Sequence, residues 1–188
     1  MHFLDKIFFQ SDLDSSPLIK GEYESCKFQN CNFSYFDLTG YKFTDCVIDT
    51  CDLSLAKIHN VIFSNVYFKD CKMLGLRFDT CNEFGLIFKF EGCILNHSSF
   101  HKTKIRRTIF KNTQMIEVDF SQCDLSNVMF DDCDLSRAVF ENSILEHTDF
   151  TSAYNYSFDP EKNKMKKAKF SMAGVPGLLM KYGIEIKK

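Results

Sequence analysis

The sequence predicts an all-β protein whose chain winds into a four-sided β-helix. Three observations predict this fold. Between residues 90 and 150 an apolar residue stands at every fifth position without exception. A small or β-branched residue precedes each of these positions by two, except at Phe88. Phenylalanine recurs every ten residues in the same stretch.

A five-residue period fits neither regular element. A helix turns about 100° per residue, so positions five apart share no stripe. An unbroken strand alternates its faces, so every second large residue would point outward. The inward positions instead alternate in steps of two and three, which indicates a short piece of strand followed by a bend. A chain that bends in the same way every five residues forms a solenoid.

The phenylalanine spacing indicates how many sides each coil has. In a four-sided coil, ten residues make half a turn, so two opposed walls would supply phenylalanine and the other two aliphatic residues. A three-sided coil would mix them on every wall. Successive coils should lie about 4.8 Å apart, the spacing of strands in a sheet.

Three segments are expected along the chain. Residues 1–20 follow the rhythm poorly and should form a cap over the first coil, whose open strand edge would otherwise favour aggregation. Residues 21–158 should form the β-helix, with its rhythm clear from Tyr23 onward. Two extra residues within 82–87 predict a bulge there. This bulge is either a partner contact through Glu83, Phe84 and Leu86 or a tolerated surface insertion.

The C-terminal segment, residues 159–188, leaves the rhythm at Asp159-Pro160. Pro176 and Gly183 are typical of the first turn and the end of a short helix. Ile184 and Ile186 alternate with polar residues as in a final strand. We expect this segment to cap the last coil and to pair with a second copy by two-fold symmetry. The expected dimer interface comprises Leu178, Leu179, Met180, Tyr182, Ile184 and Ile186.

Cysteine and histidine positions argue against metal, cofactor and catalytic chemistry. All nine cysteines fall in the small position of the repeat, which predicts buried, reduced thiols that pack as small apolar side chains. Cys31, Cys51 and Cys71 should share one inward column. The five histidines show no ligand spacing, and no nucleophile or phosphate-loop motif occurs. We therefore expect no enzyme, no metal and no cofactor. The N-terminus lacks signal-peptide character and no apolar run is long enough for a membrane span, so we expect a cytoplasmic protein.

Charge is segregated along the chain although the net charge is only −2. Residues 114–150 hold nine acids and one base, a balance of −8, whereas residues 101–111 hold five bases and no acid. The candidate partner-binding acids are Asp119, Asp124, Asp131, Asp132, Asp134, Glu141, Glu146 and Asp149. They should spread over all four walls, with Asp131, Asp132 and Asp149 as the largest cluster on one wall. The alternative interpretation is an acidic surface that keeps a repeat protein in solution.

The repeat resembles that of the pentapeptide-repeat family, most closely at residues 26–34 and 123–127. This resemblance implies a right-handed quadrilateral β-helix. The tail, with Asp159-Pro160 and the stretch from Gly177 to Ile186, is similar to the C-terminus of the Qnr-type quinolone-resistance proteins. That similarity implies a homodimer that mimics DNA, binds DNA gyrase and topoisomerase IV, and protects them from quinolones. It implies no direct binding of nucleic acid.

Three functions remain open from the sequence. The leading hypothesis is a topoisomerase-binding DNA mimic that uses its outward carboxylates. The alternative is a non-enzymatic interaction scaffold with a different protein partner, which would need the walls but not the acids. A third is immunity to a single self-made toxin.

Overall fold

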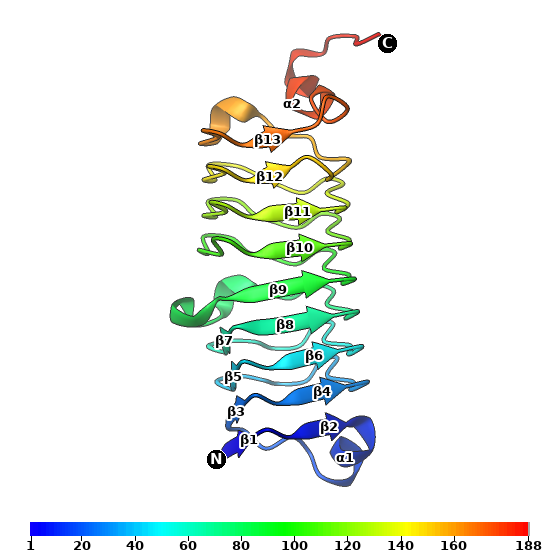
Figure 1. Ribbon diagram of the computed structural model, residues 1–188, viewed down its shortest axis with the longest axis vertical. Helices are drawn as coiled ribbons and strands as arrows, with labels where there is room; N and C mark the ends of the chain where they lie inside the picture. Colours follow the sequence, from blue (N-terminus) through cyan, green and yellow to red (C-terminus); the bar gives the residue numbers. More distant parts are fainter. Residues whose placement is uncertain (188) are drawn as a thin grey trace.

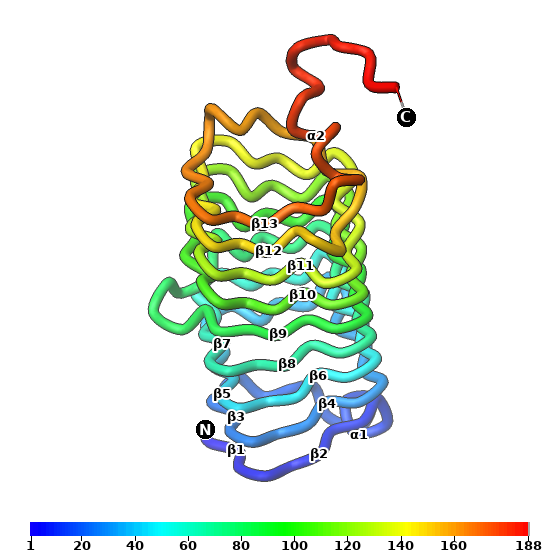
Figure 2. The backbone as a smooth tube through the Cα atoms, turned by 45° about the horizontal axis from the view of Figure 1, so that its top comes forward, coloured from blue at the N-terminus to red at the C-terminus, as the bar shows by residue number. Residues whose placement is uncertain are grey.

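The computed structural model describes residues 1–187 and confirms a right-handed, four-sided β-helix (Figures 1 and 2). The first strands are β1 (His2–Leu4), β2 (Ile7–Phe9), β3 (Glu22–Glu24), β4 (Lys27–Gln29), β5 (Lys42–Thr44), β6 (Val47–Asp49), β7 (Ile62–Ser64) and β8 (Val66–Lys69). The later strands are β9 (Phe88–Glu91), β10 (Ile109–Lys111), β11 (Met129–Asp131), β12 (Asp149–Phe150) and β13 (Lys169–Phe170). The helical segments are α1 (Gln10–Ser15), η1 (Phe78–Thr80), η2 (Glu83–Gly85), η3 (Pro160–Lys162), α2 (Pro176–Leu179) and η4 (Met180–Tyr182).

Four walls surround one core, and we number them in the order in which the chain visits them from β9. Wall 1 is a nine-stranded parallel sheet in the order β13-β12-β11-β10-β9-β8-β6-β4-β2. Walls 2 and 3 contain only isolated parallel bridges, centred in the later coils on Met115 and Phe120. Wall 4 begins as the sheet β1-β3-β5-β7 and continues as bridges around Ile105 and Leu125. Residues twenty apart pair along each wall, as Phe110 does with Phe130, so one coil takes twenty residues.

The bend that the sequence requires is made by a left-handed residue two positions after each inward one. From Gly92 to His147 every fifth residue has a positive φ, and the pattern recurs in most of the N-terminal coils. Such a conformation costs an ordinary residue roughly 1–2 kcal/mol. Asparagine and aspartate tolerate it best, and they supply eleven of the 23 non-glycine cases among residues 1–187. Burial of a large side chain in every unit offsets this cost.

Phenylalanine rings stack along walls 1 and 3 in the C-terminal half, as the ten-residue spacing predicted. The ring centroids of Phe90 and Phe110 lie 5.0 Å apart and those of Phe100 and Phe120 lie 5.2 Å apart, with nearly parallel planes. In the N-terminal half the second aromatic column lies on wall 4 instead, where Phe43 and Phe63 stack at 5.6 Å. The column therefore changes walls next to the insertion: Phe78, just before it, already stacks on Phe100 in wall 3, and opposed phenylalanine walls begin with this coil.

The β-helix begins earlier than the sequence indicated. We expected residues 1–20 to be a cap outside the rhythm, but β1 and β2 pair with β3 and β4 in the regular twenty-residue register. Phe3 and Phe8 occupy inward positions and stack on Tyr23 and Phe28. The cap is confined to the segment around α1, which replaces the next wall of the first coil (Figure 1). There the Gln10 side-chain oxygen accepts a 2.7 Å hydrogen bond from the Asn32 N–H.

The C-terminal segment folds back over the last coil and then leaves it (Figure 2). Leu178 packs against the core, and Lys181 Nζ lies 2.7 Å from carboxylates of both Asp159 and Glu161. The predicted helix is present as α2 followed by η4, and it ends at Gly183 in a left-handed conformation. Residues 184–187 form no strand, because an extended segment needs a hydrogen-bonded neighbour and this one points away from the body. Lys188, the end of the expected segment, lies outside the described residues.

No helix in the described part of the chain is both long and apolar enough to cross a membrane.

The stacked core predicts a large penalty for removing a ring. Replacing Phe120 by alanine should lower the free energy of unfolding by about 3–5 kcal/mol, because the ring is fully buried between Phe100 and Phe140. Urea denaturation followed by circular dichroism measures this change. The control is Phe84→Ala, whose ring is 91% exposed and whose loss should cost less than about 0.5 kcal/mol. Equal losses in the two variants would contradict the described core.

Candidate protein interfaces

The acids predicted from the sequence lie on all four walls. Wall 1 carries Asp131, Asp132 and Asp149, wall 2 carries Asp134, wall 3 carries Asp119 and Glu141, and wall 4 carries Asp124 and Glu146. The register brings Asp149 beside Met129, so the wall 1 acids belong to neighbouring coils. No single wall therefore presents the whole acidic segment.

Many of these carboxylates are already paired with cations. Glu141 lies 3.1 Å from Lys162, and Asp149 lies 3.1 Å from Lys169. Asp119 lies 3.9 Å from the ring of His101. Glu117, the remaining acid of the segment, lies 2.7 Å from Arg137. The exposed negative charge is thus smaller than the balance of −8 suggests.

Asp124 is not available to a partner, so its inclusion among the candidate binding acids was wrong. Its side chain is only 6% exposed and contacts Arg106 at 2.5 Å. It also accepts hydrogen bonds from the N–H and hydroxyl of Ser126. Burial alone would raise the pKa of this carboxyl, but the hydrogen bonds from Arg106 and Ser126 outweigh it and hold the pKa below its usual value. Asp124 has a structural role.

Three acids without cationic partners among residues 1–187 form a carboxylate corner between walls 1 and 2: Asp131, Asp132 and Asp134. Asp131 accepts a hydrogen bond from the Ser152 hydroxyl, and Asp134 accepts hydrogen bonds from the N–H and hydroxyl of Ser136 and from the Asn155 amide. Tyr154 stands beside them, and burial together with Asp134 and Asp132 raises the pKa of its hydroxyl. These bonds hold the carboxylates of Asp131 and Asp134 in place, whereas Asp132 is bonded only through its backbone N–H, which donates to the Ser152 hydroxyl.

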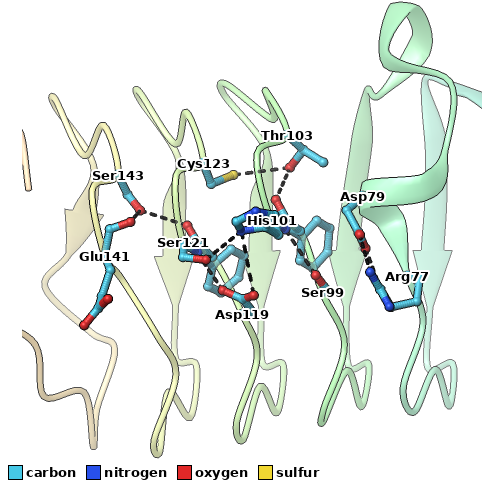
Figure 3. Close-up of polar contacts among 12 residues, drawn as sticks. Arg77, Asp79, Ser99, His101, Thr103, Asp119, Ser121, Cys123, Glu141 and Ser143 are labelled. Atoms are coloured by element: carbon cyan, nitrogen blue, oxygen red, sulfur yellow. Dashed lines mark hydrogen bonds and ion pairs between the residues drawn. The ribbon is translucent and has the colours of Figure 1, made fainter.

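Polar side chains on wall 3 form a ladder that superficially suggests catalysis (Figure 3). His101 Nδ1 lies 2.8 Å from the Ser121 hydroxyl and 3.9 Å from Asp119. A catalytic triad needs the acid and the nucleophile on opposite ring nitrogens. Here both contact the same nitrogen, so the geometry does not activate the serine. The neighbouring Arg77 and Asp79 form an ion pair through two hydrogen bonds and are occupied with each other.

The insertion makes one coil of 22 residues, since Val66 pairs with Phe88. Its tip, η2, projects from the side of the molecule just before β9 (Figure 1). Phe84 is 91% exposed, as expected for a contact, and Glu83 is exposed too. Leu86 is only 7% exposed because its side chain packs into the core, which excludes it from a contact surface. The sequence analysis missed Ile87, whose side chain is exposed instead.

The loop is held close to the wall beneath it. A Cβ added to Gly85 would meet Ile62 at 2.8 Å, so only glycine fits there without displacing β7. The Asn82 side chain caps η2 by accepting a hydrogen bond from the Phe84 N–H. Phe84 is therefore presented on a supported tip.

The tail residues expected at a dimer interface divide into two groups. Leu178 and Leu179 are half-buried, and Leu178 packs on the core. Met180, Tyr182, Ile184 and Ile186 are all more than half exposed. Only the second group is free to meet a second copy.

The cysteines offer no metal site. All nine are free, and eight are buried in the small inward positions that the repeat predicted. Cys31, Cys51 and Cys71 lie in one inward column, and Cys93 continues it. No group of three or more potential ligands is arranged to hold a metal ion within residues 1–187.

Taken together, residues 1–187 form a solenoid whose candidate functional surfaces are its walls, the projecting loop and the tail. A family model for eight copies of the pentapeptide repeat matches residues 24–65, and one for a pentapeptide-repeat region matches residues 88–154. Both matches stop short of the stretch that contains the insertion. The chain belongs to the pentapeptide-repeat family.

Solved structures of QnrB1, described as a plasmid-mediated fluoroquinolone resistance protein, share this fold. One trypsin-treated variant has a TM-score of 0.66 at 17% identity and covers 100% of this chain and 98% of its own. A second has a TM-score of 0.64 at 16% identity, with 100% and 99% covered. Full-length QnrB1 has a TM-score of 0.51 at 19% identity, with 97% of both chains covered. No curated protein matches this chain in sequence.

The buried Asp124 carboxylate predicts a pH-dependent stability. The folded pKa of this carboxyl lies below the unfolded value of about 3.9. Its contribution to the free energy of unfolding is therefore complete above that pH and is lost as the pH falls through the folded pKa. Asp124→Asn should therefore cost about 1–2 kcal/mol at pH 7, with a smaller difference near pH 3. Urea denaturation at both pH values measures this. Asp132→Asn, at an exposed position without an ion pair among the described residues, is the control. An Asp124→Asn penalty that grows on acidification would contradict the assignment.

Proposed function

We propose that this protein acts by binding, without catalysis, and that its partners are the bacterial type II topoisomerases DNA gyrase and topoisomerase IV. In this proposal the carboxylate corner occupies part of a basic DNA-binding surface inside the bacterial cell and protects the enzyme from quinolones. The fold shared with QnrB1 supports the comparison. The observation that carries the proposal is the set of three carboxylates without a cationic partner among residues 1–187, Asp131, Asp132 and Asp134, of which Asp131 and Asp134 are held by hydrogen bonds.

Fixed carboxylates suit this role better than mobile ones. A surface that replaces DNA must present negative charge in a stable pattern, and complementary potentials also accelerate encounter with a basic partner. Asp131 and Asp132 flank a corner of the coil, where the left-handed conformation of Asp132 sets its direction. Asp149, Glu141 and Asp119 would add to this field once a stronger cationic partner displaces their lysine or histidine neighbours.

The loop would supply a second contact of a different kind. Phe84, with Glu83 beside it, projects beyond the walls and could enter an apolar pocket of the partner, where aromatic anchors contribute most. Leu86 serves only to fasten the loop.

Neutralising the corner should weaken protection. With Asp131→Asn and Asp132→Asn together, we expect the protein concentration for half-protection of gyrase supercoiling against a fluoroquinolone to rise about three- to tenfold. Asparagine keeps the shape and tolerates the left-handed bend. Protection by the unaltered protein should also weaken as salt is raised.

Asp49→Asn with Asp70→Asn is the matched control, because these residues occupy the same two positions of the unit on wall 1 in the N-terminal half. This variant should protect as well as the unaltered protein. If the unaltered protein fails to bind gyrase or to protect it at micromolar concentration, the proposal is rejected.

The alternative is a scaffold with a different protein partner. The extensive pairing of acids with cations favours it, since a surface in which most charges are balanced is not specialised for mimicking DNA. A scaffold would retain its partner in the Asp131→Asn, Asp132→Asn variant. A toxin-immunity role would show protection from one peptide poison and none from a fluoroquinolone.

We also infer an end-to-end homodimer through the exposed part of the tail, Met180, Tyr182, Ile184 and Ile186. Four large apolar or aromatic side chains exposed on one short segment are costly in water and would be covered by a second copy. The alternating pattern of Ile184 and Ile186 would then form a strand only in the dimer.

Light scattering after size exclusion tests the dimer. The unaltered protein should have about twice the mass of the 21.9 kDa chain, and Met180→Asp with Ile184→Asp should give the monomer. Met172→Asp, at an 88% exposed position of the same C-terminal segment but outside the proposed interface, should remain a dimer. A monomeric unaltered protein, or a tail variant that still dimerises, would contradict this inference.

A further inference from the structure

The insertion leaves an open strand edge in wall 4. Between regular coils of this wall, the Ile105 N–H donates to the Asp124 carbonyl, the Arg107 N–H donates to the Ser126 carbonyl, and the Asp124 N–H donates to the Thr103 carbonyl. These bonds saturate the side of residues 104–107 that faces the C-terminus. The opposite side should bond to the preceding coil in the same way.

That preceding coil is missing from the wall at this point. Its residues 83–85 form η2, which lies against β7 and does not pair with residues 104–107, while the Asn82 and Ile87 N–H groups donate backward, to Val61 and Phe63. Within residues 1–187, the Lys104 N–H and the carbonyls of Lys104 and Arg106 consequently have no hydrogen-bond partner. The equivalent groups one coil later are all bonded. The insertion has vacated one strand position.

Grooves with a positive rim lie at both ends of this edge. One, of about 700 Å³, is lined by Phe84, Lys102 and Lys104, and also by Glu83 and by Asp79, which is paired with Arg77. The other, of about 810 Å³, is lined by Ile87, Arg107, Glu146 and Arg106, which is paired with Asp124. Both volumes fall in the range of about 300–1,000 Å³ that is typical of ligand sites.

The charges without an ion pair among residues 1–187 are three cations against two acids, Glu83 and Glu146, so the site is positive on balance. Lys102, Lys104 and Arg107 are exposed and form no ion pair with any of residues 1–187. Exposed Phe84 and Ile87 add apolar surface next to them. The site therefore combines open backbone groups, positive charge and apolar anchors.

We propose that this edge binds an extended acidic segment of a partner protein, which adds a strand along residues 104–107 beneath the loop. Added strands gain affinity from backbone hydrogen bonds and specificity from neighbouring side chains. Two of the three open groups are carbonyls, which need N–H donors. A peptide backbone supplies them, whereas the phosphodiester backbone of a nucleic acid offers only acceptors. The open groups thus favour a peptide although the charge alone would suit either.

The test uses the full-length protein and a fluorescein-labelled eight-residue peptide of alternating glutamate and valine. Fluorescence anisotropy should show saturable binding, and hydrogen exchange should show that the Lys104 amide becomes protected. The same peptide N-methylated at alternate residues, which removes its strand donors, should bind at least about tenfold more weakly. An alternating lysine–valine peptide should not bind.

Charge reversal tests whether the peptide binds at this edge or is attracted to any basic part of the surface. Lys104→Glu with Arg107→Glu should weaken binding about tenfold or more. Lys164→Glu with Lys167→Glu is the matched control, because these residues hold the same positions on wall 4 but their coil is bonded to its predecessor through Lys164. This control should bind as the unaltered protein does.

Three results would overturn the proposal: equal weakening in both variants, equal binding of the N-methylated peptide, or tighter binding of an eight-nucleotide oligothymidylate than of the peptide. The site lies apart from the carboxylate corner and has the opposite sign. Phe84 belongs to both proposed contacts, but Lys104 and Arg107 belong to this edge alone. Gyrase binding can therefore fail while this edge still binds the peptide, and the reverse outcome is equally distinguishable.

Discussion

The whole structure depends on one repeated constraint: the chain must bend after every five residues, so that one large side chain of each unit is buried in the core. Each bend forces a residue into the left-handed region, which is unfavourable on its own, and each sealed side chain compensates for it. Parallel backbone bonds then place equivalent residues of successive coils above one another, so the rings stack at about 5 Å. Because every unit has the same length and the same inward position, inserted residues cannot remain in the wall and must project from it. The insertion at 82–87 is expelled in this way, and it leaves both a projecting tip and a vacant strand position.

The sequence predicted the parts of the fold that follow from periodicity. It predicted the five-residue period, the small positions that cysteine occupies, the two-residue insertion and the phenylalanine walls beyond residue 90. Residues 1–20 were misjudged because Phe3 and Phe8 fall in rhythm but α1 interrupts the pattern directly after them. The sequence also indicates the bends, because asparagine, aspartate or glycine stands two positions after many inward residues. The shift of the aromatic column from wall 4 to wall 3 depends on packing across the core, which spacing along the chain does not contain.

The candidate surfaces were less predictable than the fold. A count of acids cannot tell Asp124, which is buried against Arg106, from Asp132, which is exposed at a corner. That difference depends on the neighbouring coil: Arg106, eighteen residues before Asp124 on the same wall, covers its carboxylate. Leu86 and Ile87 likewise exchange the roles expected of them, because the loop returns to the wall at Leu86 and turns that side chain inward. What remains is a rod with two exposed surfaces of opposite sign, an acidic corner in the later coils and a basic edge beside the loop.

The accessibility of the cysteine thiols tests the repeating inward position most directly. Eight of the nine cysteines occupy that position and are at most 2% exposed, and only Cys81, beside the insertion, is partly open. Burial also raises the pKa of most of these thiols, for instance to about 12 at Cys133, which slows their reaction further. Titration of the native protein with a thiol reagent at neutral pH should therefore leave eight cysteines unreacted, and all nine should react once urea unfolds the chain. Rapid reaction of several cysteines in the folded protein would contradict the sealed square coil on which the rest of this account depends.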